Sequence, residues 1–479
     1  MAQFNANNKV FRSLLLSIAV TTFITLLFFL AHSERVTGSL SQLKLGNFAS
    51  SQCSPPADTD LTRISTSITV TGTAGSTPSA TPVRSILPAK QGNPDLLQVV
   101  PSYVKAIFDP NDNAFQRLDC PPTASISRRY EYLRISPTAP SRRRYFFALD
   151  LYQIADILPQ LMGSLIQVIL FLGPHNCVLS IVEGRSTDGT YEILRSLAPQ
   201  LEELGVPYFL QMSGLSPQRA NPERIVLLAE LRNLALRDIY EHPDAYAPDA
   251  TIIFSNDVYT CAEDILEIVH QQYFQKAHMT CGMDWANSSN PEQPRLYDTW
   301  VARSMTGDTF YKDMFDWDGG FFPDHAPSLA RWSKWLPVQV FSCWNGVVAI
   351  TAKPFMDGTL RFRGVEGAAR EKKDEECYQG EPNHLTKDLW YLGYNRIATL
   401  PTITAAYNYW DARSTRELRG SVTRHALLLN GTAEEKISWE KDPPEKFHCI
   451  PAERDPEWVP WDQGCAAIYG KRRPAQEIP

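Results

Sequence analysis

Three patterns are missing from this 479-residue chain, and each absence excludes a class of protein. There is no extended basic stripe: the net charge is -7, and the one short basic cluster, Arg142–Arg144, is typical of a solvated turn before a strand. Because phosphate backbones are bound by such stripes, we expect no nucleic-acid partner. There is no CxxC pair, so we expect no structural zinc site. No internal repeat is found either.

Charged residues are also missing between Arg12 and His32, where the chain is strongly apolar. A stretch of this length predicts a transmembrane helix over residues 11–32. Lys9 and Arg12 precede it, which favours a cytoplasmic tail at residues 1–10 and a type II orientation. A cleaved signal peptide is the alternative, but its apolar core is usually shorter, and no clear small-residue cleavage site precedes Ser33.

Residues 33–100 are poor in large apolar side chains and rich in Ser, Thr and Pro over much of their length. Such a segment cannot bury enough apolar surface to fold alone, so it predicts a flexible stem before a lumenal domain at residues 101–479. All nine cysteines follow the apolar stretch, and a lumenal location permits disulfides. The sequons at Asn287 and Asn430 agree with that location.

Strand and helix patterns alternate between Arg144 and Trp285. The predicted strands are 144–150, 176–184, 207–212, 250–259 and 278–285, and three of the predicted helices are 154–173, 223–242 and 261–277. A fourth helix is predicted after the second strand, with Ile193, Leu194, Leu197, Leu201 and Leu204 on one face. Alternation of this kind predicts an α/β fold, a Rossmann-type and mostly parallel sheet with helices on both faces. Ligands of such sheets bind beyond the carboxyl ends of the strands. Those ends are acidic or amide residues here: Asp150, Glu183, Asn256, Asp257 and Asp284.

The stretch SIVEGRSTDGT illustrates the chemistry available at these ends. Ser186, Thr187 and Asp188 suit a helix start, which is the purely structural interpretation. Glu183 precedes that turn, and a carboxylate there can accept hydrogen bonds from a sugar hydroxyl or a base N–H. In FSNDVY, Asp257 can hold a divalent cation through oxygen ligands, or the turn can be a simple helix cap.

EGRSTDGT, FSNDVY, CGMDW, YDTWVARS, VFSCWNG, FRG and EECY occur in this order along residues 101–409. Together they resemble the motifs of family 69 glycosyltransferases, the fungal family of the cryptococcal α-1,3-mannosyltransferase and the capsule-associated proteins. The resemblance implies a type II Golgi membrane enzyme of GT-A type that uses GDP-mannose and Mn²⁺. It implies nucleotide-sugar contacts at Glu183, Ser186, Asp188, Asn256 and Asp284, and a metal ligand at Asp257, within Ser-Asn-Asp rather than a full DxD. Three residues depart from the expected pattern: Arg185, Ser304 and Glu375.

The second half is predicted to be irregular and rich in aromatic residues, whose faces suit sugar rings, although each ring is about as often simple core. We place acceptor or sugar contacts at Trp300, Arg303, Trp344 and Asn345. The resemblance makes Glu376 the first candidate for a catalytic carboxylate, and Asp388 is the second. A Cys343–Cys377 disulfide is hypothesised to join the loops that carry them.

The implied activity is transfer of mannose to a hydroxyl of a mannose-containing glycan, forming an α-1,3 linkage with retention. A front-face mechanism needs no protein base, and a covalent intermediate is its alternative. Two other functions compete: a glycoside hydrolase with paired carboxylates, which has no need of a nucleotide loop, and a non-catalytic lumenal protein that binds or scaffolds glycans, which the departures at Arg185 and Ser304 keep open.

Overall fold

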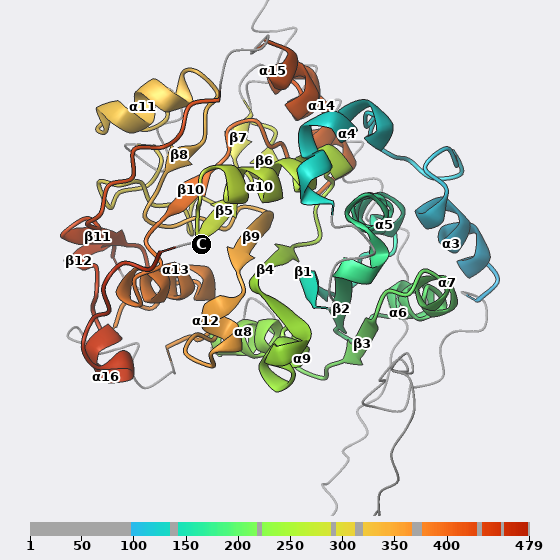
Figure 1. Ribbon diagram of the computed structural model, residues 1–479, viewed down its shortest axis with the longest axis horizontal. Coiled ribbons are helices and arrows are strands. Elements are labelled where there is room, and N and C mark those ends of the chain that lie inside the picture. Colours follow the sequence, from blue (N-terminus) through green and yellow to red (C-terminus); the bar gives the residue numbers. More distant parts are fainter. Residues whose placement is uncertain are drawn as a thin grey trace, which may run out of the picture. The chain divides into compact units, whose positions relative to one another are not determined.

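An eight-stranded mixed sheet organises the chain (Figure 1). The strands are β1 (Arg143–Leu151), β2 (Cys177–Glu183), β3 (Tyr208–Met212), β4 (Tyr246–Ser255), β5 (Met279–Cys281), β8 (Val338–Gln339), β9 (Val347–Thr351) and β10 (Ile397–Thr399), in the order β3-β2-β1-β4-β9-β5-β10-β8. The pairs among β1 to β4, and the pair β5–β10, are parallel, whereas β9 and β8 run antiparallel to their neighbours. The sheet is therefore mixed and mostly parallel, as predicted.

The computed structural model describes residues 97–134, 142–217, 223–288, 294–311, 320–365, 376–428, 434–451 and 455–477. These all belong to one unit, Ser76–Pro479. The predicted tail, transmembrane segment and nearly all of the predicted stem lie outside the described residues, as do Glu375 and the sequon asparagine Asn430. In the described part of the chain, no helix has the length and hydropathy needed to cross a bilayer.

Side chains of β1 alternate between two cores, one on each face of the sheet. Phe147 and Leu149 pack with α5 (Leu158–Leu172), α6 (Thr190–Ser196) and α10 (Ala262–Phe274). Phe146 and Ala148 pack with α8 (Arg224–Ala235) and α13 (Glu381–Tyr391) on the other face. Figure 1 shows the sheet between these groups of helices, which is the layered arrangement that alternating strands and helices predict.

Local chemistry sets the element ends. Pro159 lies in the first turn of α5, where its missing N–H costs no helical hydrogen bond. The predicted helix 223–242 is two helices, α8 and α9 (Arg237–Glu241).

The remaining elements are α3 (Val100–Phe108), α4 (Thr123–Tyr130), η1 (Glu131–Leu133), η2 (Pro174–Asn176), α7 (Ala198–Glu203), η3 (Pro243–Ala245), β6 (Trp285–Ala286), β7 (Arg295–Leu296), α11 (Ala326–Trp332), α12 (Lys353–Met356), α14 (Tyr409–Arg419), α15 (Val422–Leu428), β11 (Lys446–Cys449), β12 (Glu457–Pro460) and α16 (Cys465–Tyr469).

The second half is more regular than predicted, because β8, β9 and β10 complete the same sheet. β9 inserts between β4 and β5, where its residues Val347–Ile350 are fully buried. These three strands have two to five residues each, too few for a periodic pattern to stand out in the sequence.

Three disulfides join described residues: Cys120–Cys261, Cys281–Cys343 and Cys377–Cys449. The hypothesised Cys343–Cys377 pair is wrong. Cys343 lies just before β9, and Cys281 ends the strand that pairs with β9, so those two meet. Cys177 and Cys465 are free and buried.

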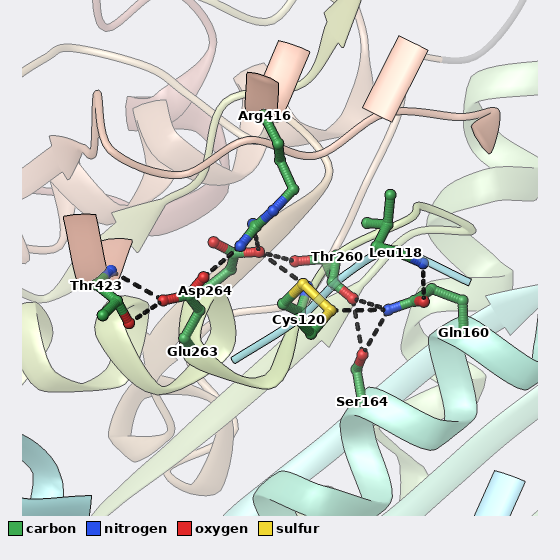
Figure 2. Close-up of a disulfide and its surroundings, with 10 residues drawn as sticks. Leu118, Cys120, Gln160, Ser164, Thr260, Glu263, Asp264, Arg416 and Thr423 are labelled. Carbon is green, nitrogen blue, oxygen red and sulfur yellow. Dashed lines mark hydrogen bonds and ion pairs between the residues drawn. A yellow bond between two sulfur atoms is a disulfide. The ribbon is translucent and has the colours of Figure 1, made fainter. Parts of the chain in front are cut away.

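Figure 2 shows Cys120–Cys261, which fastens the segment before α4 to the N-cap of α10. Arg416 of α14 forms ion pairs with Glu263 and Asp264 in the first turn of α10, and Thr423 donates to Glu263. Acidic side chains at this end also oppose the positive end of the helix dipole. These contacts hold α14 and α15 against the start of α10.

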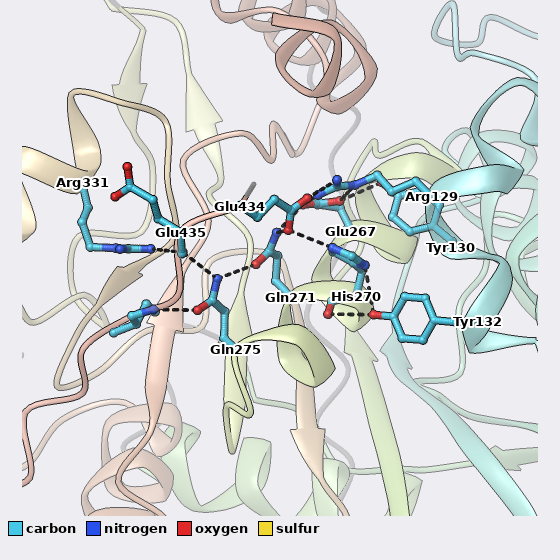
Figure 3. Close-up of polar contacts among 11 residues, drawn as sticks. Arg129, Tyr130, Tyr132, Glu267, His270, Gln271, Gln275, Arg331, Glu434 and Glu435 are labelled. Carbon is cyan, nitrogen blue, oxygen red and sulfur yellow. Dashed lines mark hydrogen bonds and ion pairs between the residues drawn. The ribbon is translucent and has the colours of Figure 1, made fainter. Parts of the chain in front are cut away.

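A second polar network lies farther along α10 (Figure 3). Glu267 accepts from Arg129 and from Tyr130, at 2.8 Å each, and His270 contacts Glu434 at 3.1 Å. A cavity with a volume of about 230 Å³ lies beside these groups. The charged side chains of the network are paired with one another, so the network is structural: it joins α4, α10 and the segment at Glu434.

Candidate functional site

The chain continues from β1 to β2 on one side and places β4 on the other, so the order of strands reverses between β1 and β4. Ligand crevices of open α/β sheets lie at such a point, beyond the carboxyl ends of the strands. A cavity with a volume of about 480 Å³ lies there. Its lining comes from strand ends, from one face of α8 and from loops: Asp150, Phe254, Asn256, Asp257, Arg224, Leu228, Arg232, Tyr297, Asp298, Trp300, Val301, Trp344, Gly380, Glu381, Pro382 and Tyr407.

Carboxylates dominate the strand-end side of the cavity. Burial raises the pKa of Asp150 to about 7 and the pKa of Asp257 to about 6. Burial also raises the pKa of Asp298. Elevated values mean that the folded protein leaves part of this negative charge uncompensated. A cation bound among these groups would supply the missing charge.

A network of hydrogen bonds joins residues of the cavity lining to buried residues behind them. Buried Asn345 donates from Nδ2 to Asp284 Oδ1 and to the Asp298 carbonyl, both at 2.9 Å. Tyr407 receives a 2.9 Å hydrogen bond from Asn256 Nδ2, and the Asn256 side-chain oxygen accepts from Trp344 Nε1 at 3.0 Å. Asp284, Asn256, Trp344 and Asn345, all predicted site residues, are thus brought together.

The backbone at Asn345 has φ +35°, a left-handed conformation that asparagine tolerates better than most residues. Gly346 follows at φ +90°, and a Cβ there would come within 3.2 Å of Ala405 Cβ. This turn places the Trp344 ring on the cavity and the Asn345 amide beneath it. Asp284 and Asn345 are fully buried, so both act through their neighbours.

Arg232 and Glu381 form the buried ion pair of the cavity. Arg232 Nε donates to Glu381 Oε1 at 2.7 Å, and the guanidinium lies 4.3 Å from the centroid of the Trp344 ring. Breaking such a pair leaves a buried charge alone, which is strongly destabilising. The pair therefore fixes α8, the start of α13 and Trp344 relative to one another.

The predicted nucleotide loop is folded by its own polar groups. The Glu183 carboxylate accepts the backbone N–H groups of Arg185 at 2.9 Å and Ser186 at 2.7 Å. Ser186 Oγ accepts from the Gln153 N–H, and Asp188 accepts from the Ala155 N–H and from Thr190. These contacts join the loops after β1 and β2. The nucleotide-binding roles of these three residues stay predictions.

Two departures from the family pattern have visible consequences. Arg185 has φ +62°, a left-handed conformation that glycine and asparagine adopt more readily than arginine. Ser304 Oγ contacts Thr306 Oγ1 at 2.7 Å within a turn and does not line the cavity.

Trp300 lines the cavity, but Arg303 does not. Arg303 is fully buried and donates to backbone carbonyls, among them His448 at 2.7 Å and Trp300 at 3.0 Å. Burial lowers its pKa to about 10. The structure thus gives Arg303 a supporting position beside the cavity, and its direct sugar contact stays a prediction.

Glu376 and Asp388 also lie outside the cavity lining. Arg363 bridges them, with hydrogen bonds of 2.6 and 2.7 Å to Glu376 and of 2.7 and 2.8 Å to Asp388. Lys387 also pairs with Glu376, and Tyr469 donates to Asp388 at 2.9 Å. Both carboxylates are thus ion-paired with neighbouring side chains, and their catalytic role stays a prediction.

Sequence reasoning missed several lining residues. Asp298 lies within the YDTW motif but was not singled out, and Glu381 follows the favoured Glu376 by five positions. Arg224, Leu228 and Arg232 recur every four residues along α8, a spacing that puts them on one helical face. That spacing was the available signal for the two arginines.

Residues 144–388 match the family model described as cryptococcal mannosyltransferase 1, just over half of the chain. The chain belongs to this family. The family resemblance is thereby confirmed, and the protein is a mannosyltransferase by class. The chain is also 29% identical over 384 residues to the α-1,3-mannosyltransferase CMT1 of Cryptococcus neoformans, covering 75% of this chain and 80% of that one.

Solved structures give more distant matches. The mannosyltransferase PcManGT from Pyrobaculum calidifontis, in complex with GDP-Man and Mn²⁺, is 12% identical, with 71% of this chain and 77% of that one covered at a TM-score of 0.32. TarS 1-349 of S. aureus, in complex with UDP-GlcNAc, is 11% identical, with 61% and 68% covered at 0.31. Likeness at this level says nothing of ligand or activity.

The carboxylates of the cavity decide whether it could hold a divalent cation together with substrate phosphates. Across the described residues, no group of three or more His, Cys, Asp or Glu side chains is arranged to hold a metal by itself. A cation that bridges substrate phosphates needs only one or two protein carboxylates. Asp257, Asp150 and Asp298 all line the cavity and are the residues that could supply such carboxylates.

Proposed function

We propose that this protein transfers mannose from GDP-mannose to a hydroxyl of a mannose-containing glycan, forming an α-1,3 linkage with retention. The observation that carries the proposal is the cavity at the β1/β4 switch point, where buried carboxylates and two arginines face the same space. Membership of the mannosyltransferase family and the name of the fungal relative support the sugar and the linkage.

Asp257 is the proposed metal ligand, with Asp150 and Asp298 beside it in the lining. A Mn²⁺ ion bound there would neutralise the charge that develops on the leaving diphosphate. The ion pair of Arg232 with Glu381 and the Asn345 network hold the lining rigid, so the donor meets a preorganised site.

The acceptor is proposed to enter beside Tyr297, Trp300 and Trp344. Tyr297 is 46% exposed and packs on Tyr407 with ring centroids 4.6 Å apart, which gives an aromatic surface at the edge of the cavity. In a front-face transfer the sugar–phosphate bond breaks while the bond from C1 to the acceptor oxygen forms on the same face. The acceptor proton moves to the departing phosphate, so the protein supplies position and charge.

We also propose a type II Golgi membrane protein with a lumenal catalytic domain. The apolar stretch at residues 11–32 and the basic residues before it support this topology. Protease treatment of sealed Golgi vesicles should leave residues 101–479 intact. Digestion of this domain without detergent would place it on the cytosolic side.

Calorimetric titration of GDP into the full-length protein tests the donor assignment. We expect GDP to bind with Mn²⁺, and to bind poorly with chelator or in Asp257→Asn. Asp244→Asn, at an exposed acidic residue outside the cavity, is the control and should bind as the wild type does. Folded wild-type protein that binds no GDP under any of these conditions would refute the donor assignment.

A further inference from the structure

Arg224 differs from the other arginines near the cavity because no described residue forms an ion pair with it. Arg232 is paired with Glu381, and Arg363 is paired with Glu376 and Asp388. Within the part of the chain that the structure describes, Arg224 has no ion-pair partner, and its Nε is buried without a hydrogen bond. An unsatisfied buried donor of this kind is costly unless a ligand satisfies it.

The position of Arg224 is set by α8. Arg224, Leu228 and Arg232 lie on one face of this helix, and all three line the cavity. Arg232, one end of that row, is fixed by its ion pair and by its contact with the Trp344 ring. The helix therefore presents the Arg224 guanidinium to the cavity from a rigid support.

Charge is distributed unevenly around the cavity. Asp150 and Asp257 stand at the strand ends, and the unpaired cation is on α8. An anionic ligand fits this distribution if a divalent cation joins it to the strand-end carboxylates while its remaining negative charge faces the arginine on α8. A diphosphate is such a group, since a metal on one side leaves further oxygens for a guanidinium, which binds phosphate in bidentate fashion.

We propose that Arg224 binds the diphosphate of the nucleotide-sugar donor and so acts as a donor-positioning residue. This inference rests on the proposed function. It assigns to the α8 face a recognition role for phosphate, separate from recognition of the base or the sugar.

The test compares Arg224→Gln with Arg224→Lys and with the wild type, each as the full-length protein with Mn²⁺, by titration with GDP and with guanosine. Arg224→Gln should bind GDP about 10- to 100-fold more weakly, the loss of one charge-assisted phosphate contact. Arg224→Lys should fall between, because lysine keeps the charge but not the bidentate geometry. Guanosine binding should not change. Arg195→Gln, at an exposed arginine of α6, is the matched control and should bind GDP normally.

Without ligand, Arg224→Gln should melt at or slightly above the wild type, because glutamine removes the unsatisfied buried donor and no described residue pairs with Arg224. GDP binding that is unchanged in Arg224→Gln but lost in Asp257→Asn would overturn this inference and leave the proposed function standing. Equal weakening of GDP and guanosine would also overturn it, because the contact would not be to phosphate. A wild-type protein that binds no GDP would refute the proposed function and this inference together.

Discussion

Replacing Asp257 with asparagine is expected to stabilise the metal-free protein while removing cation-dependent donor binding. Burial raises the pKa of Asp257 from its ordinary value of 3.8 to about 6. Because one pKa unit corresponds to about 1.4 kcal/mol, keeping this carboxylate ionised at pH 7.5 costs the fold at most about 3 kcal/mol. Asparagine has the same shape and no charge, so the variant recovers most of that free energy.

For a folded domain of this size, about 3 kcal/mol corresponds to a rise in the unfolding midpoint of about 4 °C. The effect depends on pH in a defined direction. A raised carboxyl pKa means that the folded state binds the proton more tightly than the unfolded chain does. The wild type therefore gains stability relative to the variant as the pH falls from about 6 to about 4, and the difference in midpoints shrinks.

Differential scanning fluorimetry of both proteins from pH 4.5 to pH 7.5, with chelator and then with Mn²⁺ and GDP, measures all of these effects. Mn²⁺ with GDP should raise the midpoint of the wild type and leave the variant unchanged, since a ligand stabilises only a fold that binds it. A variant that melts below the wild type at pH 7.5 with chelator, or that responds equally to Mn²⁺ and GDP, would refute the reasoning. Asp244→Asn should match the wild type throughout.

Three further predictions concern the scaffold. Arg363→Met should lower the free energy of unfolding by about 3–5 kcal/mol in urea denaturation, because Glu376 and Asp388 lose their shared partner; a change below about 1 kcal/mol would show that Arg363 does not hold the pair. Glu376→Gln should keep Mn²⁺-dependent GDP binding, because Glu376 lies outside the cavity lining; loss of GDP binding in a folded variant would contradict that placement, and loss of transfer alone would support the predicted catalytic role. Peptide mapping without reduction should find Cys281–Cys343 and Cys377–Cys449, whereas a linked Cys343–Cys377 peptide would contradict the fold around β9.

The sequence predicted the parallel half of the sheet well, because β1 to β4 are apolar runs separated by helices of clear periodicity. It also placed Asp257 and Asn256 at a strand end, where they line the cavity. The antiparallel insertion of β9 was not predictable in the same way, since Val347–Thr351 has no local signal for its partners, which are β4 and β5.

Residue roles were harder to predict than strand ends. Glu376 and Asp388 lie in a charged region that carries a motif, yet both carboxylates form ion pairs with Arg363. Only the tertiary fold brings Arg363 to this place. Arg303 appeared suited to a sugar and is enclosed by backbone carbonyls. Glu381 and Arg232, 149 residues apart, become a site only when α8 and α13 pack together.

The central claim is mannose transfer from GDP-mannose, and one assay tests it most directly. The full-length protein is incubated with GDP-mannose, Mn²⁺ and an α-linked mannobiose acceptor, and the products are resolved by mass and by NMR. We predict GDP and a trisaccharide with one added mannose in α-1,3 linkage, and no trisaccharide from Asp257→Asn. A folded wild-type protein that binds GDP with Mn²⁺ but leaves GDP-mannose unconsumed with mannoside acceptors, or releases only free mannose, would contradict the account.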